Sequence, residues 1–240
     1  MKTPVMVLAR GDLKLIIRDS TLVMALFGPL AITGLLFSLP MIESLIISRF
    51  SFDPSPYRLF IVCFLTQIPG MLFAMIYGFI ILDERDEEVI EFISITPLRK
   101  QGYLTYKLIM PMLLSVVFFL LIFYATALVP LNPLHGLGIA MMVALEAAIG
   151  TLFLVVFSEN KVEGLAFSKL LGIMYLAFPL VFFWDSGWHW LSAFLPPFWI
   201  AKAFLHSHLG SPWIWSDIFF GVIVHVVILL FFLKAFLRKR

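Results

Sequence analysis

Long apolar runs alternate with short polar segments along this chain. A run of about 18 or more apolar residues is long enough to cross a bilayer as a helix. We place six such spans, at residues 21–42, 58–82, 105–129, 137–157, 165–184 and 213–234. No region outside them reaches the roughly 50 residues of an independent domain. The pattern therefore predicts an all-α integral membrane protein with one transmembrane domain over residues 1–240.

The segment before the first span has the pattern of a helix lying on a membrane surface. Arg10, Lys14 and Arg18 follow one another at four-residue steps, and apolar residues gather on another side. Such a helix rests in the interface between lipid and water. We predict an interfacial elbow helix over residues 4–19; the alternative is that these residues merely extend the first span.

Residues 185–212, before the last span, are apolar but interrupted by Pro196 and Pro197. Proline ends or kinks a helix, and tryptophan prefers the headgroup level of a bilayer. We predict a re-entrant helical hairpin that dips into the outer leaflet. All the tryptophans lie in it or beside it, at Trp184, Trp188, Trp190, Trp199, Trp213 and Trp215.

A dense charged segment separates the second and third predicted spans. Six acids and four cations are concentrated there: Asp83, Glu84, Asp86, Glu87, Glu88, Glu91, Arg85, Arg99, Lys100 and Lys107. Each charge would cost about 2.5–3.5 kcal/mol inside hydrocarbon. Residues 83–104 must therefore lie in water, either to contact another protein or only to fix the topology.

Composition agrees with a membrane protein. The chain is 62% hydrophobic and 13% charged, with a mean hydropathy of +1.03, whereas soluble domains carry about 25% charged residues. A net charge of +2 does not suggest nucleic acid as a partner. With these spans, fourteen of the seventeen Lys and Arg residues fall on one side. The positive-inside rule then predicts that both termini and the charged segment are cytoplasmic.

The sequence contains no recognisable catalytic or energy-supplying motif. It lacks the P-loop pattern, the HExxH pattern and any cysteine–histidine cluster, so we expect no enzyme activity, metal or cofactor in this chain. The single cysteine, Cys63, excludes a disulfide within the chain. The basic start leads into an apolar run too long for a signal peptide, which predicts an uncleaved first span.

Two ionisable residues lie inside predicted spans. Glu146 is near the middle of the fourth span, among small residues that would allow another helix to approach closely, and His225 is midway along the sixth. An ionisable residue at membrane depth is a candidate functional residue. Both are candidates for a substrate cavity; the alternative is that each only forms a hydrogen bond between helices.

The charged segment and its flanks carry a recognisable pattern. A span ends in an acidic–basic pair, an amphipathic helix follows, and a proline and a lysine lead into the next span; the matching residues are Glu84, Arg85, Glu91, Thr96, Pro97, Tyr103 and Lys107. With the topology, this resembles a type-2 ABC exporter permease over nearly the whole chain. The stretch SENKVEGLAFSKLLG (158–172) resembles a cytoplasmic turn of bacterial permeases labelled as fluoroquinolone exporters. Many members have glycine where this chain has Glu88.

The resemblance implies a membrane subunit of a bacterial ABC exporter in the inner membrane. Two permease chains, identical or paired with a sister, would bind separate ATPase subunits that hold the ATP and Mg²⁺, and would move a drug, lipid or peptide outward. Val89, Phe92, Ile93 and Leu98 would seat the coupling segment on the bundle. The implied coupling residues are Glu84, Arg85, Glu87, Glu88, Glu91, Pro97 and Lys107.

Other classes of protein stay open at this point. A stand-alone secondary carrier would need ion-coupling polar residues in broken helices, for which only Glu146 and His225 qualify. A small intramembrane enzyme or assembly factor would need paired catalytic groups at one depth, and the sequence offers none. A haem-export permease has the same topology.

Overall fold

A computed structural model describes residues 4–184 and 186–238, and this part of the chain is built of helices joined by short turns. The short 3₁₀ helices are η1 (Ser55–Tyr57) and η2 (Gly187–Ser192). The α-helices are α1 (Pro4–Arg18), α2 (Ser20–Phe50), α3 (Arg58–Asp86), α4 (Val89–Ser94), α5 (Arg99–Thr126), α6 (Pro133–Phe157), α7 (Lys161–Met174), α8 (Ala177–Phe183), α9 (Pro196–His208) and α10 (Ile214–Arg238).

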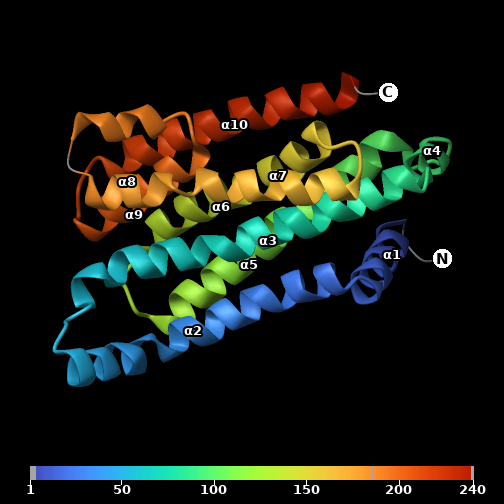
Figure 1. The fold of residues 1–240 in the computed structure, drawn as a ribbon. Coiled ribbons are helices and arrows are strands. Elements are labelled where there is room, and N and C mark those ends of the chain that lie inside the picture. The colour runs from blue at the N-terminus through green and yellow to red at the C-terminus, as the bar shows by residue number, and fades with distance from the viewer. Residues whose placement is uncertain (1–3, 185, 239–240) are drawn as a thin grey trace.

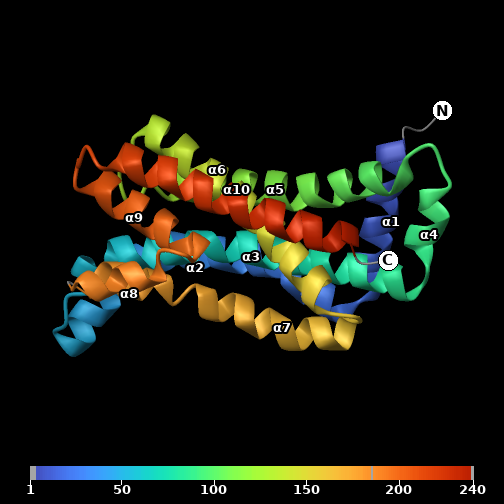
Figure 2. The same cartoon turned by 90° about the horizontal axis from the view of Figure 1, so that it is seen from above.

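The long helices run side by side and form an elongated bundle with two unlike ends (Figure 1). We call one end the charged end; α1 and α4 lie across it, and both ends of the described chain reach it (Figure 2). We call the other the tryptophan end; it carries η1, η2 and α9. The extended backbone of Asp19 separates α1 from α2, so the first helix does not simply extend the first span. Its position in the membrane interface stays a prediction.

Six helical segments of the described chain are long and apolar enough to cross a membrane, which confirms the predicted fold class. Their bounds differ from the prediction. The first runs from Ser20 to Phe50, eight residues beyond the predicted end at residue 42. It passes Glu43 because that carboxylate is paired with Arg58 of α3, at 2.9 Å and 2.5 Å. A paired carboxylate costs far less to bury than a bare one.

The other bounds shift in the same way at the ends of the bundle. The third span begins at Arg99 rather than at residue 105, and the sixth ends at Arg238 rather than at residue 234. The fifth is two helices, α7 and α8, with a break at Tyr175 and Leu176. As a result, the polar segment between the second and third spans is shorter than the predicted 83–104 and consists of α4 with a turn on either side.

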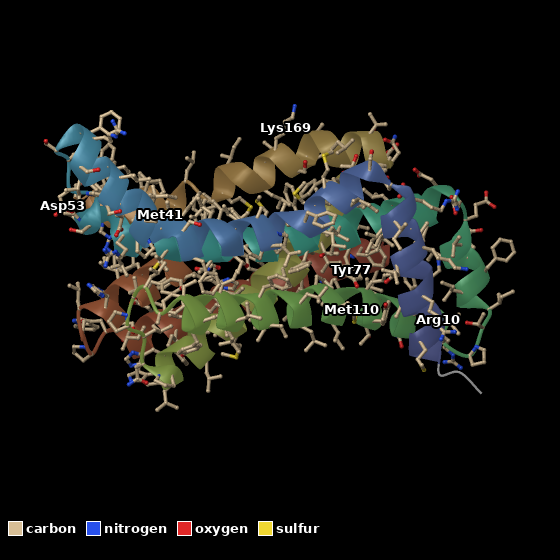
Figure 3. The ribbon with its side chains drawn as sticks, turned by 90° about the horizontal axis from the view of Figure 1, so that it is seen from below. Arg10, Met41, Asp53, Tyr77, Met110 and Lys169 are labelled. Carbon is tan, nitrogen blue, oxygen red and sulfur yellow. The ribbon has the colours of Figure 1, made fainter. Side chains whose placement is uncertain are left out.

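The core is centred on α6. In its most apolar stretch 72% of the residues are buried, against 22% for α2, for α7 with α8, and for α10. Small residues allow the close contacts: Gly78 of α3 lies against Leu154, and Gly150 of α6 lies against Ala74. The peripheral helices expose long apolar flanks, as at Met41 of α2, and Lys169 of α7 points away from the bundle (Figure 3). These flanks suit lipid or another membrane helix.

Candidate functional site

The short helix α4 crosses the charged end and is joined to α3 and α5 by two tight turns. Glu88 has φ of 58° and Arg99 has φ of 54°, both in the left-handed region. This region costs an ordinary residue roughly 1–2 kcal/mol, so glycine is favoured there. The chain therefore makes this bend with Glu88 itself rather than with glycine. The two turns set α4 off as a separate, short element.

One face of α4 rests on the bundle and the other is open to solvent. Val89 and Ile93 are partly buried, as is Leu98 in the turn that follows. Phe92 was expected to join them, but 68% of its surface is exposed, so this prediction is wrong. The helix has only six residues, and Phe92 lies on its outer face. Glu87, Glu88, Glu91 and Pro97 are exposed.

Beneath α4 lies a buried charged cluster that joins three helices. The Lys107 ammonium of α5 is 2.6 Å from Asp12 of α1 and 2.8 Å from Glu84 of α3. Tyr106 donates a hydrogen bond of 2.9 Å to Asp12, and Tyr103 donates one to Glu84. Lys107 is 0% exposed. Opposite charges and hydroxyl donors compensate one another here, which permits burial at the membrane edge.

This arrangement bears on two of the predicted coupling residues. Glu84 and Lys107 are buried, so neither offers a contact surface to a partner. Both help to hold α1, α3 and α5 together at the charged end. Asp12 was not among the predicted site residues. The sequence could have indicated its burial, because Asp12 lies four residues from both Leu8 and Ile16 and so shares the packed face of α1.

A second set of polar contacts fixes the turn between α6 and α7 to the same end. Arg85 donates hydrogen bonds of 3.0 Å to the backbone carbonyls of Ser158 and Val155. Lys161 pairs with Asp83 at 2.5 Å and also with Asp19. Partial burial alone would raise the pKa of Asp19, but hydrogen bonds from Lys161 and from two backbone N–H groups hold that pKa below its ordinary value. Arg85, a predicted coupling residue, therefore ties the end of α3 to the end of α6.

An open groove of about 1200 Å³ lies at the charged end, beside these two sets of polar contacts. It runs between α4, the turn after α6 and the last turn of α10. Acidic, basic and apolar side chains all contribute to its walls, a mixture typical of a protein–protein contact surface. The lining residues are Arg85, Glu88, Ile90, Glu91, Lys100, Glu159, Phe236 and Leu237.

A separate, much smaller cavity of about 20 Å³, with room for about one water molecule, lies beside Glu146 inside the bundle. Neither Glu146 carboxylate oxygen is exposed, and neither has a hydrogen-bond partner by geometry among the described residues. The hydroxyl of Tyr175, on the same cavity wall, is near enough to interact. Tyr175 lies at the break between α7 and α8. The cavity therefore combines an almost unpartnered carboxylate with an interrupted membrane helix.

The other cavity candidate, His225, does not reach this space. His225 is fully buried, and its Nδ1 lies 2.7 Å from the carbonyl oxygen of Gly221 in the preceding turn of α10. It is not among the residues that line the Glu146 cavity, most of which are apolar. The lining residues are Met71, Ala74, Glu146, Ile149, Gly150, Leu171, Met174, Tyr175 and Pro196.

The tryptophan end differs from the sequence prediction in one respect. Pro196 and Pro197 do not break a helix but begin α9, where the missing N–H of proline costs nothing. The 3₁₀ helix η2 precedes it and carries Trp188 and Trp190, which are largely exposed, whereas Trp199 of α9 is 8% exposed. Whether this segment enters the outer leaflet stays a prediction.

Comparison with known proteins identifies a family. The family described as "Fluoroquinolones export permease protein Rv2686c-like" matches residues 12–233. Two curated relatives from Mycobacterium tuberculosis are each 24% identical over 235 residues, which cover 96% of this chain and 93% of the relative. They are the fluoroquinolones export permease proteins MT2760 of strain CDC 1551 / Oshkosh and Rv2686c of strain ATCC 25618 / H37Rv. No solved structure matches the chain. Because the match spans nearly all of its length, the chain belongs to the Rv2686c-like family of export permeases, which are multi-pass membrane proteins.

Proposed function

We propose that this permease is the membrane subunit of an ATP-driven exporter, with the charged end in the cytoplasm and a separate ATPase bound there. The main support for the proposal is the way in which α4 is attached to the bundle. The helix projects acidic side chains into solvent beside a groove of about 1200 Å³, and it stands on a cluster of buried ion pairs. A partner that moves α4 would therefore move α3 and α5 with it.

The distribution of cationic residues between the two ends of the bundle supports this orientation. Arg10 and most other cations lie at the charged end, and that end would be cytoplasmic by the positive-inside rule (Figure 3). The ATPase subunits would supply ATP and Mg²⁺. A second permease chain, identical or related, would pack against an exposed flank such as that of α2 or α7. The transported compound would be apolar or amphipathic, like the walls it must pass.

One observation favours a second candidate function. Secondary carriers place ion-coupling polar groups where a membrane helix is broken, and Glu146 lies beside the break at Tyr175. In that case proton binding at Glu146 would drive transport with no ATPase. The two functions need different energy sources, so one experiment can distinguish them.

Gentle purification of the exporter should recover the chain together with a nucleotide-binding subunit.

Glu146→Gln separates a substrate-binding role from a structural one. The substitution keeps the shape of the side chain and removes the charge that a cationic substrate would pair with. If the carboxylate meets substrate, we expect cationic compounds to lose about tenfold in their stimulation of ATP hydrolysis while neutral ones lose little. Substrate-stimulated ATPase activity and melting temperature, measured on one preparation, check this.

The matched control is His225→Gln, which removes an ionisable group buried in α10 outside the cavity. That variant should change stability and leave substrate preference alone. An unchanged preference across cationic and neutral compounds in Glu146→Gln would remove Glu146 from the substrate path and leave it a packing residue of α6.

A further inference from the structure

A second open groove, of about 1010 Å³, lies at the tryptophan end, far from the charged end. Residues of α9 spaced by three and four positions form one wall, and residues around the start of α10 with the same spacing form the other. Trp190 of η2 also lines the groove. The lining residues are Trp190, Trp199, Lys202, His206, Trp213, Ser216, Asp217 and Phe220.

The groove contains a half-buried cation with no ion-pair partner among the described residues. The Lys202 ammonium lies over the ring of Trp190, 4.2 Å from its centroid, and takes part in none of the described salt bridges. Burial lowers the pKa of Lys202. At the same end, by contrast, Arg58 is paired with Glu43, and Arg49 is exposed to solvent. Lys202 is thus a partly desolvated positive charge that an anion would stabilise.

The carboxylate in the groove is already engaged. Asp217 is 4% exposed and lies 2.5 Å from Nδ1 of His206. Asp217 also lies near enough to Lys202 to raise its pKa, but the effect of burial is larger and the pKa stays lowered. An anion in the groove would therefore meet the Lys202 ammonium as its main partner, since the indole N–H of Trp199 is already donated to the carbonyl oxygen of Ala193.

An apolar strip leads from the groove along α10. Phe220 lines the groove, and Ile223, Val227 and Leu230 follow it at three- and four-residue steps, each at least 43% exposed. Ten residues of helix are about 15 Å long at 1.5 Å per residue. The strip is therefore long enough to hold a large part of an acyl chain, with the cation at its headgroup end.

We propose that this groove binds a membrane phospholipid, whose phosphate pairs with Lys202 and whose acyl chain lies along Phe220, Ile223, Val227 and Leu230. Charge and shape both point to this occupant. The tryptophans place the groove at headgroup level, where phosphate is abundant. A second permease chain would cover the strip but would leave the ammonium without an anion.

The test is native mass spectrometry of the intact, delipidated permease with added dioleoylphosphatidylglycerol. We expect one phospholipid to be retained, and dioleoylglycerol, which lacks the phosphate, to bind about tenfold more weakly. This comparison uses the unmodified protein and so does not depend on the folding of any variant. Inorganic phosphate alone should displace the lipid only weakly, because it gains nothing from the apolar strip.

Variants locate the site. Lys202→Gln should weaken phosphatidylglycerol binding about tenfold, and Lys202→Arg should retain it. Arg49→Gln, which removes an exposed cation at the same end of the bundle, should have no effect. Equal binding of phospholipid and dioleoylglycerol, unchanged binding in Lys202→Gln, or displacement by phosphate alone would each overturn the proposal. So would efficient disulfide-linked dimers of Ile223→Cys, which would show that a second chain covers the strip.

Discussion

Lys107→Met should destabilise this permease more than any other single substitution of a charged residue at its charged end. Lys107 is fully buried and lies between Asp12 and Glu84, at 2.6 Å and 2.8 Å. Its removal leaves two buried carboxylates without their cation, which costs about 3–5 kcal/mol. That corresponds to a fall of roughly 10 °C in melting temperature for a chain of this size. Thermal aggregation of the detergent-purified protein measures it.

The matched control is Lys100→Met, an exposed cation in the first turn of the same helix, which should change the melting temperature little. A triple variant with Asp12→Asn, Glu84→Gln and Lys107→Met should recover much of the lost stability, since it removes all three charges together. If Lys107→Met melts like the unmodified protein, the buried cluster does not hold α1, α3 and α5 together.

Reversing two charges of the groove beside α4 should abolish coupling without harming the fold. Glu88 and Glu91 are exposed and line this groove. Replacing both with lysine presents repulsive charges to a basic partner surface, which costs about 2–5 kcal/mol in a buried contact and should reduce transport at least about tenfold. Membrane levels should hold, because neither side chain packs in the core. Transport into inside-out vesicles and recovery of the ATPase subunit on purification measure the effect.

The control uses a neighbouring carboxylate outside the groove. Asp86 is equally exposed but does not line it, so Asp86→Lys reverses a charge at the same end of the bundle without altering the groove. This control should keep most of the transport. Full activity in the Glu88 and Glu91 variant would mean that the charged segment only fixes the topology, the alternative that the sequence left open.

Hydropathy predicted the fold class because spanning helices must be apolar over a fixed length. It misplaced span ends wherever charges are paired. The charges of Glu43 and Arg58 compensate each other. Helix α2 therefore continues past Glu43, although a charged residue at that position had suggested a loop. Because hydropathy does not recognise paired charges, it also failed to reveal the buried charged cluster. Glu84 and Lys107 read as exposed because they lie in a charged run. Only the fold shows that Lys107 lies between Glu84 and Asp12, which is 95 residues away from Lys107 along the chain.

Patterns within a few residues predicted the burial of side chains more reliably, because they depend mainly on local helix geometry. Val89, Ile93 and Leu98 are partly buried, as predicted, whereas Phe92 was misjudged because a six-residue helix has room for few packed side chains. The bend at Glu88 could not be inferred from residue preference, since glycine is favoured at positive φ. Glu146 was singled out correctly as an ionisable residue at depth, but its cavity depends on the break in the fifth span.

The central claim is that transport by this permease requires a separate ATPase bound at the charged end. The most direct measurement is uptake of a fluorescent amphipathic compound into proteoliposomes that contain the purified chain, with and without the nucleotide-binding subunit that copurifies with it. We predict uptake only with that subunit and with ATP and Mg²⁺ on the same side as α4. Sustained uptake by the chain alone, driven by a proton gradient and unaffected by ATP, would contradict this account and favour a secondary carrier.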